Sequence, residues 1–235
     1  MTAPVDTSRR AAPPLSYVSL KRARPGRPVR VLLTGFGPFP GVPVNPTEGI
    51  VAAAAARLAR ERHGVVVATE TLPTEWAMLA RLTRILARHR PDLVIMTGVA
   101  VHARGARIER SAHARANAAL ADAAGAKLIL RSGIYAHRAA RRTEVDVDRL
   151  KTALFCANLR VSVSDDPGAY LCNAAYLTAL DWAARCAPRP PVLFLHLPPP
   201  RLAQGMRAHD LAALLAKVAG TLARHPHRRG AVLPT

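Results

Sequence analysis

Cysteine, aromatic residues and acidic residues are all scarce in this chain of 235 residues. The three cysteines are widely spaced, which excludes both a disulfide framework and the paired CxxC spacing of a zinc site. Aromatic residues make up only 4%, too few for platforms on which nucleic-acid bases stack. The few cysteines suggest a reducing compartment, in which a thiol stays free to react.

Apolar segments of membrane-spanning length are also missing. The most apolar helix-like run, Tyr170–Ala184, is interrupted by Asn173 and Asp181. Residues 1–30 are rich in Pro, Ser and Arg and lack the apolar stretch of a secretory signal. We therefore expect a soluble, cytoplasmic protein with no membrane partner.

Basic residues exceed acidic ones by 34 to 15, giving a formal net charge of +19. Only four of the basic residues are lysines, and the arginines are spread over the whole chain. No zinc-finger spacing and no RNA-recognition signature accompanies them. We interpret the charge as a solvated basic surface and do not expect nucleic acid as a partner. A homo-oligomer is left open.

Strand-like and helix-like segments alternate along most of the chain. The expected strands are Val29–Thr34, Val65–Thr69, Asp92–Thr97, Lys127–Leu130, Leu159–Ser164 and Pro191–His196. The expected helices are Thr47–Arg62, Glu75–His89 (capped by Thr74), Val145–Cys156, Tyr170–Ala187 and His209–His225. This alternation predicts a single-domain three-layer α/β/α fold with a mostly parallel central sheet. The domain is expected over residues 29–225, between a flexible basic extension (1–28) and a tail (226–235).

Cys172 is the cysteine with a setting suited to catalysis. It follows a strand-like run and the turn residues Asp165–Gly168, and it lies at the start of a helix-like run. A sulfur in that place lies near free N–H groups and the positive end of the helix dipole, which both favour the thiolate. Free cysteine is more often a small buried apolar residue, so position alone leaves both interpretations open.

A histidine and a carboxylate complete a candidate constellation. His196 ends a buried strand-like run, where an imidazole can act as general base and acid, or can be a hydrogen-bonded structural group. Glu109 follows the third strand, and its alternative role is a solvated carboxylate paired with an arginine. Because sites in parallel sheets gather at the carboxyl ends of strands, we expect four segments to converge on one rim: Phe36, Thr97–Gly98, Asp165–Cys172 and His196.

Four short motifs occur in order along the chain. The first is Thr34–Phe39 (TGFGPF), followed by Val44–Pro46 (VNP). The others are Glu109-Arg110, Gly168–Asn173 (GAYLCN) and Val192–His196 (VLFLH). Together they resemble the opening loop, the glutamate motif, the nucleophile motif and the histidine strand of the pyroglutamyl peptidase I family of cysteine peptidases.

This resemblance implies a hydrolase that removes an N-terminal pyroglutamyl residue from peptides through a thioester. It implies Cys172 as nucleophile, His196 as base and then acid, and Glu109 as the carboxylate that orients the imidazole. The substrate-binding residues implied by the same match are Phe36, Phe39, Asn45 and Tyr170. Pyroglutamyl peptides are then the expected partners, and neither a cofactor nor a metal is expected.

The chain departs from the family pattern around the substrate. Gly98–Arg104 lacks the family's glutamine and has fewer glycines, and Pro40-Gly41 replaces a glycine pair. We therefore expect an intact triad beside an altered substrate cradle. Two alternatives follow: a homologue that acts on another N-terminal acyl or lactam amide, and a basic binding protein without catalysis on the same scaffold.

Overall fold

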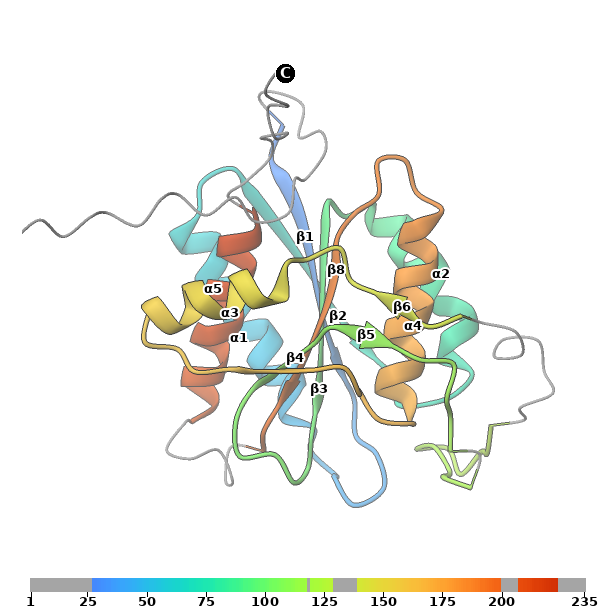
Figure 1. Cartoon of the computed structure of the whole chain (residues 1–235). Coiled ribbons are helices and arrows are strands. Elements are labelled where there is room, and N and C mark those ends of the chain that lie inside the picture. Colours follow the sequence, from blue (N-terminus) through green and yellow to red (C-terminus); the bar gives the residue numbers. More distant parts are fainter. Residues whose placement is uncertain (1–26, 118, 129–138, 200–206, 224–235) are drawn as a thin grey trace, which may run out of the picture.

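The computed structural model describes residues 27–117, 119–128, 139–199 and 207–223. Its main sheet has six strands in the order β2-β1-β3-β8-β4-β7 (Figure 1). These strands are β1 (Val29–Phe36), β2 (Val65–Leu72), β3 (Leu93–Val99), β4 (Arg107–Glu109), β7 (Ser162–Ser164) and β8 (Val192–Leu197). The helices are α1 (Pro46–Glu61), α2 (Met78–His89), α3 (Val147–Cys156), α4 (Leu171–Ala184) and α5 (Ala208–Ala223). A separate antiparallel pair joins β5 (Ser111–Ala112) to β6 (Arg141–Arg142).

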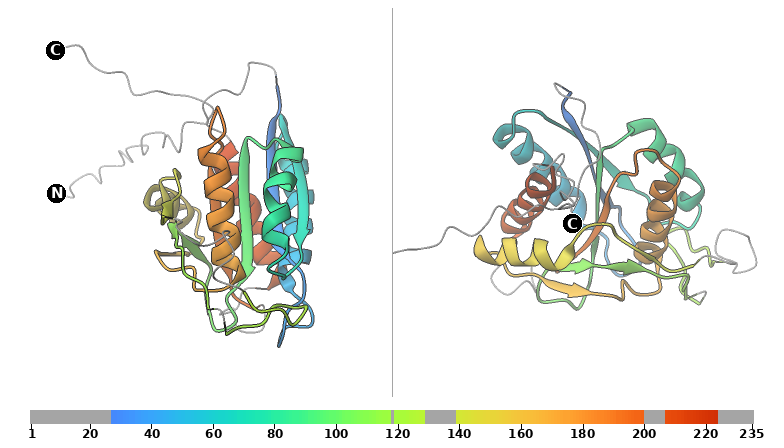
Figure 2. Two further views of the ribbon diagram at one scale, coloured as in Figure 1. Left: turned by 90° about the vertical axis from the view of Figure 1, so that its right-hand side faces the viewer. Right: turned by 45° about the horizontal axis from the view of Figure 1, so that its top comes forward.

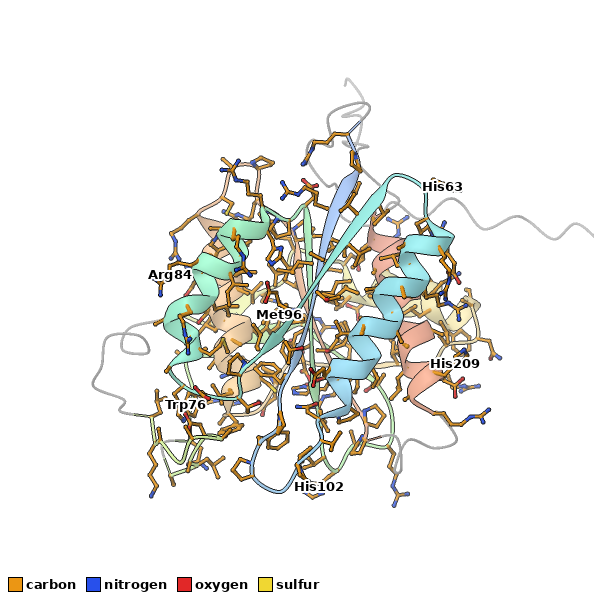
Figure 3. All side chains as sticks on the ribbon, turned by 180° about the vertical axis from the view of Figure 1, so that it is seen from behind. His63, Trp76, Arg84, Met96, His102 and His209 are labelled. Atoms are coloured by element: carbon orange, nitrogen blue, oxygen red, sulfur yellow. The ribbon has the colours of Figure 1, made fainter. Side chains whose placement is uncertain are left out.

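Helices cover both faces of the main sheet. Helices α1 and α5 lie on one face, and α2 and α4 lie on the other (Figures 1 and 2). Alternate residues of β8 serve the two layers: Leu193 and Leu195 join the core with α1 and α5, whereas Phe194 joins the core with α2 and α4. Met96 of β3, at the centre of Figure 3, is fully buried. Burial on both faces explains why these strands are continuous apolar runs.

The predicted three-layer α/β/α fold with a mostly parallel sheet is confirmed. β1, β2, β3 and β8 run parallel to one another, β4 is antiparallel to β8, and β7 is parallel to β4. β7 therefore runs against the direction of β8. Glu109 pairs with both Phe194 and Ser164, so β7 ends level with the middle of β8. The loop after Ser164, rather than the strand end itself, brings Cys172 to the site.

Several element boundaries differ from the sequence-based expectations. Helix α2 begins only at Met78, so Thr74 is not its cap, and the Thr74 hydroxyl instead donates a hydrogen bond to the Gly37 carbonyl. The strand expected at Lys127–Leu130 is wrong in its described part, where Lys127 forms only an isolated bridge with Ala121. The short strands β4, β5 and β6 were not expected, because two or three residues show no periodicity.

The two terminal segments expected to flank the domain lie almost wholly outside the described residues, and they stay predictions. The same holds for the C-terminal end of the predicted helix His209–His225, which the structure describes as far as residue 223, whereas its start agrees to within one residue with α5, which begins at Ala208. Among the described helices, none combines the length and the apolar character that crossing a membrane requires.

Candidate active site

A pocket of about 200 Å³ lies where β1, β3 and β8 end. It is lined by Phe36, Phe39, Asn45, Thr74, Val99, Val101, His196 and the segment Pro167–Cys172. Six of the seven residues expected at the site thus surround one cavity. The seventh, Glu109, is fully buried and reaches the site through His196.

Glu109 and His196 form a short contact inside the sheet. The Oε1 atom of Glu109 lies 2.6 Å from Nδ1 of His196, and the two side chains are 0% and 5% exposed. Burial raises the pKa of the Glu109 carboxyl, but hydrogen bonds from His196 and other neighbours outweigh it, and the net shift is downward. An ionised carboxylate can only accept, so Nδ1 carries the proton and Nε2 is left as the base.

The register of β4 against β8 produces this contact. Arg107 pairs directly with His196, and Glu109 pairs with Phe194. Residues two apart on a strand share a face, so Arg107, Glu109, Phe194 and His196 all project toward the α4 side of the sheet. Glu109 and His196 are diagonal neighbours there, within reach of long side chains.

Cys172 is the second residue of α4, and its sulfur lies over Gly98 of β3. A Cβ atom added at Gly98 would stand only 2.7 Å from Sγ of Cys172. Gly98 in turn pairs with His196 across β3 and β8. The nucleophile candidate and the imidazole thus line one pocket, and the absence of a side chain at Gly98 leaves room for the sulfur.

Burial affects the pKa of Cys172 more than its place at the start of α4 does. Burial raises the pKa of its thiol to about 12, the negative charge of Glu109 adds to this, and the residue's own backbone N–H opposes it. The helix N-terminus thus does not produce a resting thiolate, because loss of solvation outweighs it. The resting group is a neutral thiol that needs a base.

The three aromatic residues that the resemblance implies around the substrate, Phe36, Phe39 and Tyr170, all line the pocket. Phe36 ends β1 and is 2% exposed. Tyr170 directly precedes α4, its ring meets the Trp76 ring edge-on at 5.4 Å, and its hydroxyl donates to the Ala121 carbonyl at 2.9 Å. Contacts on both ends of Tyr170 fix the ring position before a ligand arrives.

Asn45 lines the pocket, but its amide is engaged by the protein. Its Nδ2 donates to the Gly37 carbonyl at 2.9 Å, and its Oδ1 accepts from the backbone and hydroxyl of Thr47 as the N-cap of α1. This residue and Thr74 both tie down the loop after β1 through Gly37. A direct contact of Asn45 with substrate stays a prediction, whereas its support of the loop is visible.

Asn173, next to the thiol, anchors the segment after β5. Its Nδ2 donates to the carbonyls of His113 and Arg115 at 2.7 and 2.8 Å, and its Oδ1 accepts from the His113 backbone. The side chain is fully buried. The first turn of α4 is thereby held against a loop that is distant in sequence.

Arg107 was not expected at the site. Its Nε donates to Oε1 of Glu109 at 2.7 Å, the same oxygen that accepts from His196, and its Nη2 lies 3.5 Å from Nδ1 of His196. Only the register of β4 reveals this placement, because the sequence shows an arginine among many. Within the described ranges, no cluster of three His, Cys, Asp or Glu side chains could hold a metal ion.

A buried carboxylate-imidazole pair beside a thiol, at the edge of an α/β/α sheet, is the arrangement of a cysteine-type hydrolase. The sequence model for pyroglutamyl peptidase matches residues 29–222. The chain belongs to the pyroglutamyl peptidase family.

Curated relatives and solved structures agree with this assignment. The pyrrolidone-carboxylate peptidase of Gloeobacter violaceus is 33% identical over 172 residues, covering 72% of this chain and 82% of that protein. Pyrrolidone-carboxylate peptidase 1 of Ralstonia nicotianae is 31% identical over 211 residues, covering 86% and 96%. The crystal structure of pyroglutamyl peptidase I from Bacillus amyloliquefaciens matches with a TM-score of 0.71 at 26% identity, covering 84% of this chain and 98% of that one.

Proposed function

We propose that this chain removes an N-terminal pyroglutamyl residue from peptides, with Cys172, His196 and Glu109 as the catalytic residues. The observation that carries the proposal is the buried pair of Glu109 and His196, whose Oε1 and Nδ1 atoms are 2.6 Å apart. His196 lines the same small pocket as the Cys172 thiol. Membership of the pyroglutamyl peptidase family supports the choice of substrate.

The first step is proton transfer coupled to attack. The Cys172 thiol is neutral at rest, so its sulfur becomes nucleophilic only as His196 Nε2 takes the proton. The sulfur then bonds to the pyroglutamyl carbonyl carbon, and the carbonyl electron pair moves to oxygen. Glu109 stabilises the imidazolium through Nδ1 and holds the productive tautomer.

The tetrahedral oxyanion then needs hydrogen-bond donors. The first residues of α4 offer backbone N–H groups that have no partner inside the helix. The N–H of Cys172 already faces the sulfur, which places it next to the reacting carbon. This donor and the helix dipole stabilise the developing charge.

Collapse of the intermediate expels the peptide amine, which receives the proton from His196. The acyl group remains on Cys172 as a thioester. His196 then removes a proton from water, hydroxide adds to the thioester, and free pyroglutamate leaves as the thiol is restored. Because this cycle needs a reduced thiol, we propose the cytoplasm as the location.

The pocket suits a small neutral ring. Its walls carry the apolar side chains of Phe36, Val99 and Val101, and the polar groups of Tyr170 and Asn45 are hydrogen-bonded to loop backbone. A charged N-terminal residue would lose its solvation here without gaining a partner. The lactam, which has no charge, avoids that cost.

The test is hydrolysis of a pyroglutamyl chromogenic amide by the wild type and by Cys172→Ser. We expect thiol-reagent-sensitive turnover in the wild type and a loss of at least about 10³-fold in the variant. Cys156→Ser, at an exposed cysteine of α3, is the matched control and keeps full activity. A folded wild type without turnover would refute the proposal, and a panel of other N-acyl amides would then identify the substrate.

A further inference from the structure

An apolar groove of about 750 Å³ adjoins the active-site pocket. Its walls come from the loop Phe39–Val44 and from residues at or just after the ends of β3 and β8, including Val99, Val101, His102 and Pro199. Phe39, Val99 and Val101 line both cavities, so the groove and the pocket are continuous. His102 marks this end of the molecule in Figure 3.

The loop wall of the groove has a defined shape. Phe39 and Val42 exchange two backbone hydrogen bonds of 3.1 and 2.8 Å around Pro40 and Gly41. Gly41 has φ +81°, and Pro before Gly with a positive φ is the pattern of a type II turn. A tight turn of this kind holds the neighbouring apolar side chains in place without help from a ligand.

The continuity of the groove with the pocket matters for the part of a substrate that lies beyond the pyroglutamyl group. A pyroglutamyl group is a chain terminus, so a bound substrate extends from the pocket in one direction only, past its scissile carbonyl. The groove shares the walls formed by Phe39, Val99 and Val101 with the pocket, so it offers this part of the peptide a path.

The lining chemistry selects the kind of residue. Among the described residues that line the groove, none is Arg, Lys, Asp or Glu, although the chain carries a formal net charge of +19. Val44 is 80% exposed, an unusual state for a valine, and a substrate side chain would cover it. Building on the proposed function, we propose that this groove binds the residue after the pyroglutamyl group and selects uncharged apolar or aromatic side chains.

The first experiment compares kcat/KM for the peptides pyroglutamyl-X-Ala, with X as Phe, Leu, Lys or Glu. We expect Phe and Leu to exceed Lys and Glu by roughly tenfold or more. Ratios of about threefold or less, or a preference for Lys or Glu, overturn the groove assignment. Pyroglutamyl methylamide, which puts no side chain in the groove, separates the two proposals. If the wild type does not cleave it, the proposed function has failed.

The second experiment changes the groove itself. Val44→Asp adds a carboxylate at an exposed position, and we expect the Phe/Lys ratio of kcat/KM to fall by about tenfold, chiefly through KM. Val66→Asp is the matched control, because Val66 is another exposed valine, 53% accessible, on β2. It keeps the wild-type ratio. A Val44→Asp enzyme with the wild-type ratio shows that the peptide leaves by another route.

Discussion

Replacing Gly98 with alanine tests whether the position of the Cys172 sulfur depends on the absence of a side chain at this point of β3. The added Cβ would stand 2.7 Å from Sγ of Cys172 and 3.0 Å from Cζ of Phe194. Non-bonded heavy atoms have their energy minimum at about 3.5–4.0 Å, so the sulfur would have to move by about 1 Å. Phe194 lies in the core and offers no room for the Cβ to move the other way.

The displacement affects catalysis more than folding. A shift of about 1 Å in a reacting group can cost about 10²-fold in rate, and we expect kcat of Gly98→Ala to fall by that factor. Overpacking a core by one methyl group costs about 1–3 kcal/mol, so the free energy of unfolding should fall by about 2 kcal/mol. The protein therefore stays folded while its turnover drops.

Turnover of a pyroglutamyl amide and denaturant unfolding measure the two effects. Gly49→Ala in α1 is the control, because its Cβ has no neighbour within 4 Å, and both quantities stay at or above the wild-type level. In a Cys172→Ala background the sulfur is gone, so Gly98→Ala should cost less stability there. Equal costs in both backgrounds, or a single variant with more than half of the wild-type kcat, would refute the reasoning.

Two further predictions concern the charges around the thiol and the imidazole. Arg107→Leu removes one of the hydrogen bonds that hold down the pKa of the Glu109 carboxyl, so this carboxyl takes up a proton at higher pH and the acid limb of kcat/KM against pH moves up. Arg107→Lys keeps a cation and shifts the limb less, and an unmoved limb in the leucine variant contradicts the idea. Because the raised pKa of about 12 keeps the Cys172 thiol protonated, its alkylation by iodoacetamide should accelerate about tenfold per unit between about pH 6 and pH 9. The variant with serine at positions 156 and 186 isolates this signal, and a plateau near neutral pH would show a thiolate at rest.

The central strands and the helices could be predicted because their apolar patterns are long. β1, β3 and β8 are continuous runs buried on both faces, and they appear within about two residues of their expected bounds. The start of α2 was misplaced because Trp76 fits a helical apolar pattern, yet it packs against Tyr170 beside the pocket. β4 could not be predicted, because its three residues mix charged and apolar side chains without a period.

For the candidate site, the sequence predicted which residue types take part but not how they are arranged. The motifs indicated a thiol, an imidazole and a carboxylate, and the structure brings those three groups together. The backbone N–H at the start of α4 lowers the pKa of Cys172, in the direction that its position indicated, but burial, which cannot be read from a sequence, has the larger effect and raises it. The placements of Gly98 and Arg107 depend on strand register, which a sequence of this kind does not reveal.

The triad geometry and the substrate surface depend on different parts of the fold, and this difference explains how one can diverge without the other. Glu109 reaches His196 only because β4 pairs with β8 in one register, and a slip of one residue would turn Glu109 to the opposite face. That register is fixed by core residues such as Ile108 and Leu195. Much of the pocket and groove walls comes instead from the loops after β1 and β3, outside the pairing of the main sheet. Changes in those loops can therefore alter which residue the groove accepts after the pyroglutamyl group, while the chemistry at the sulfur is preserved.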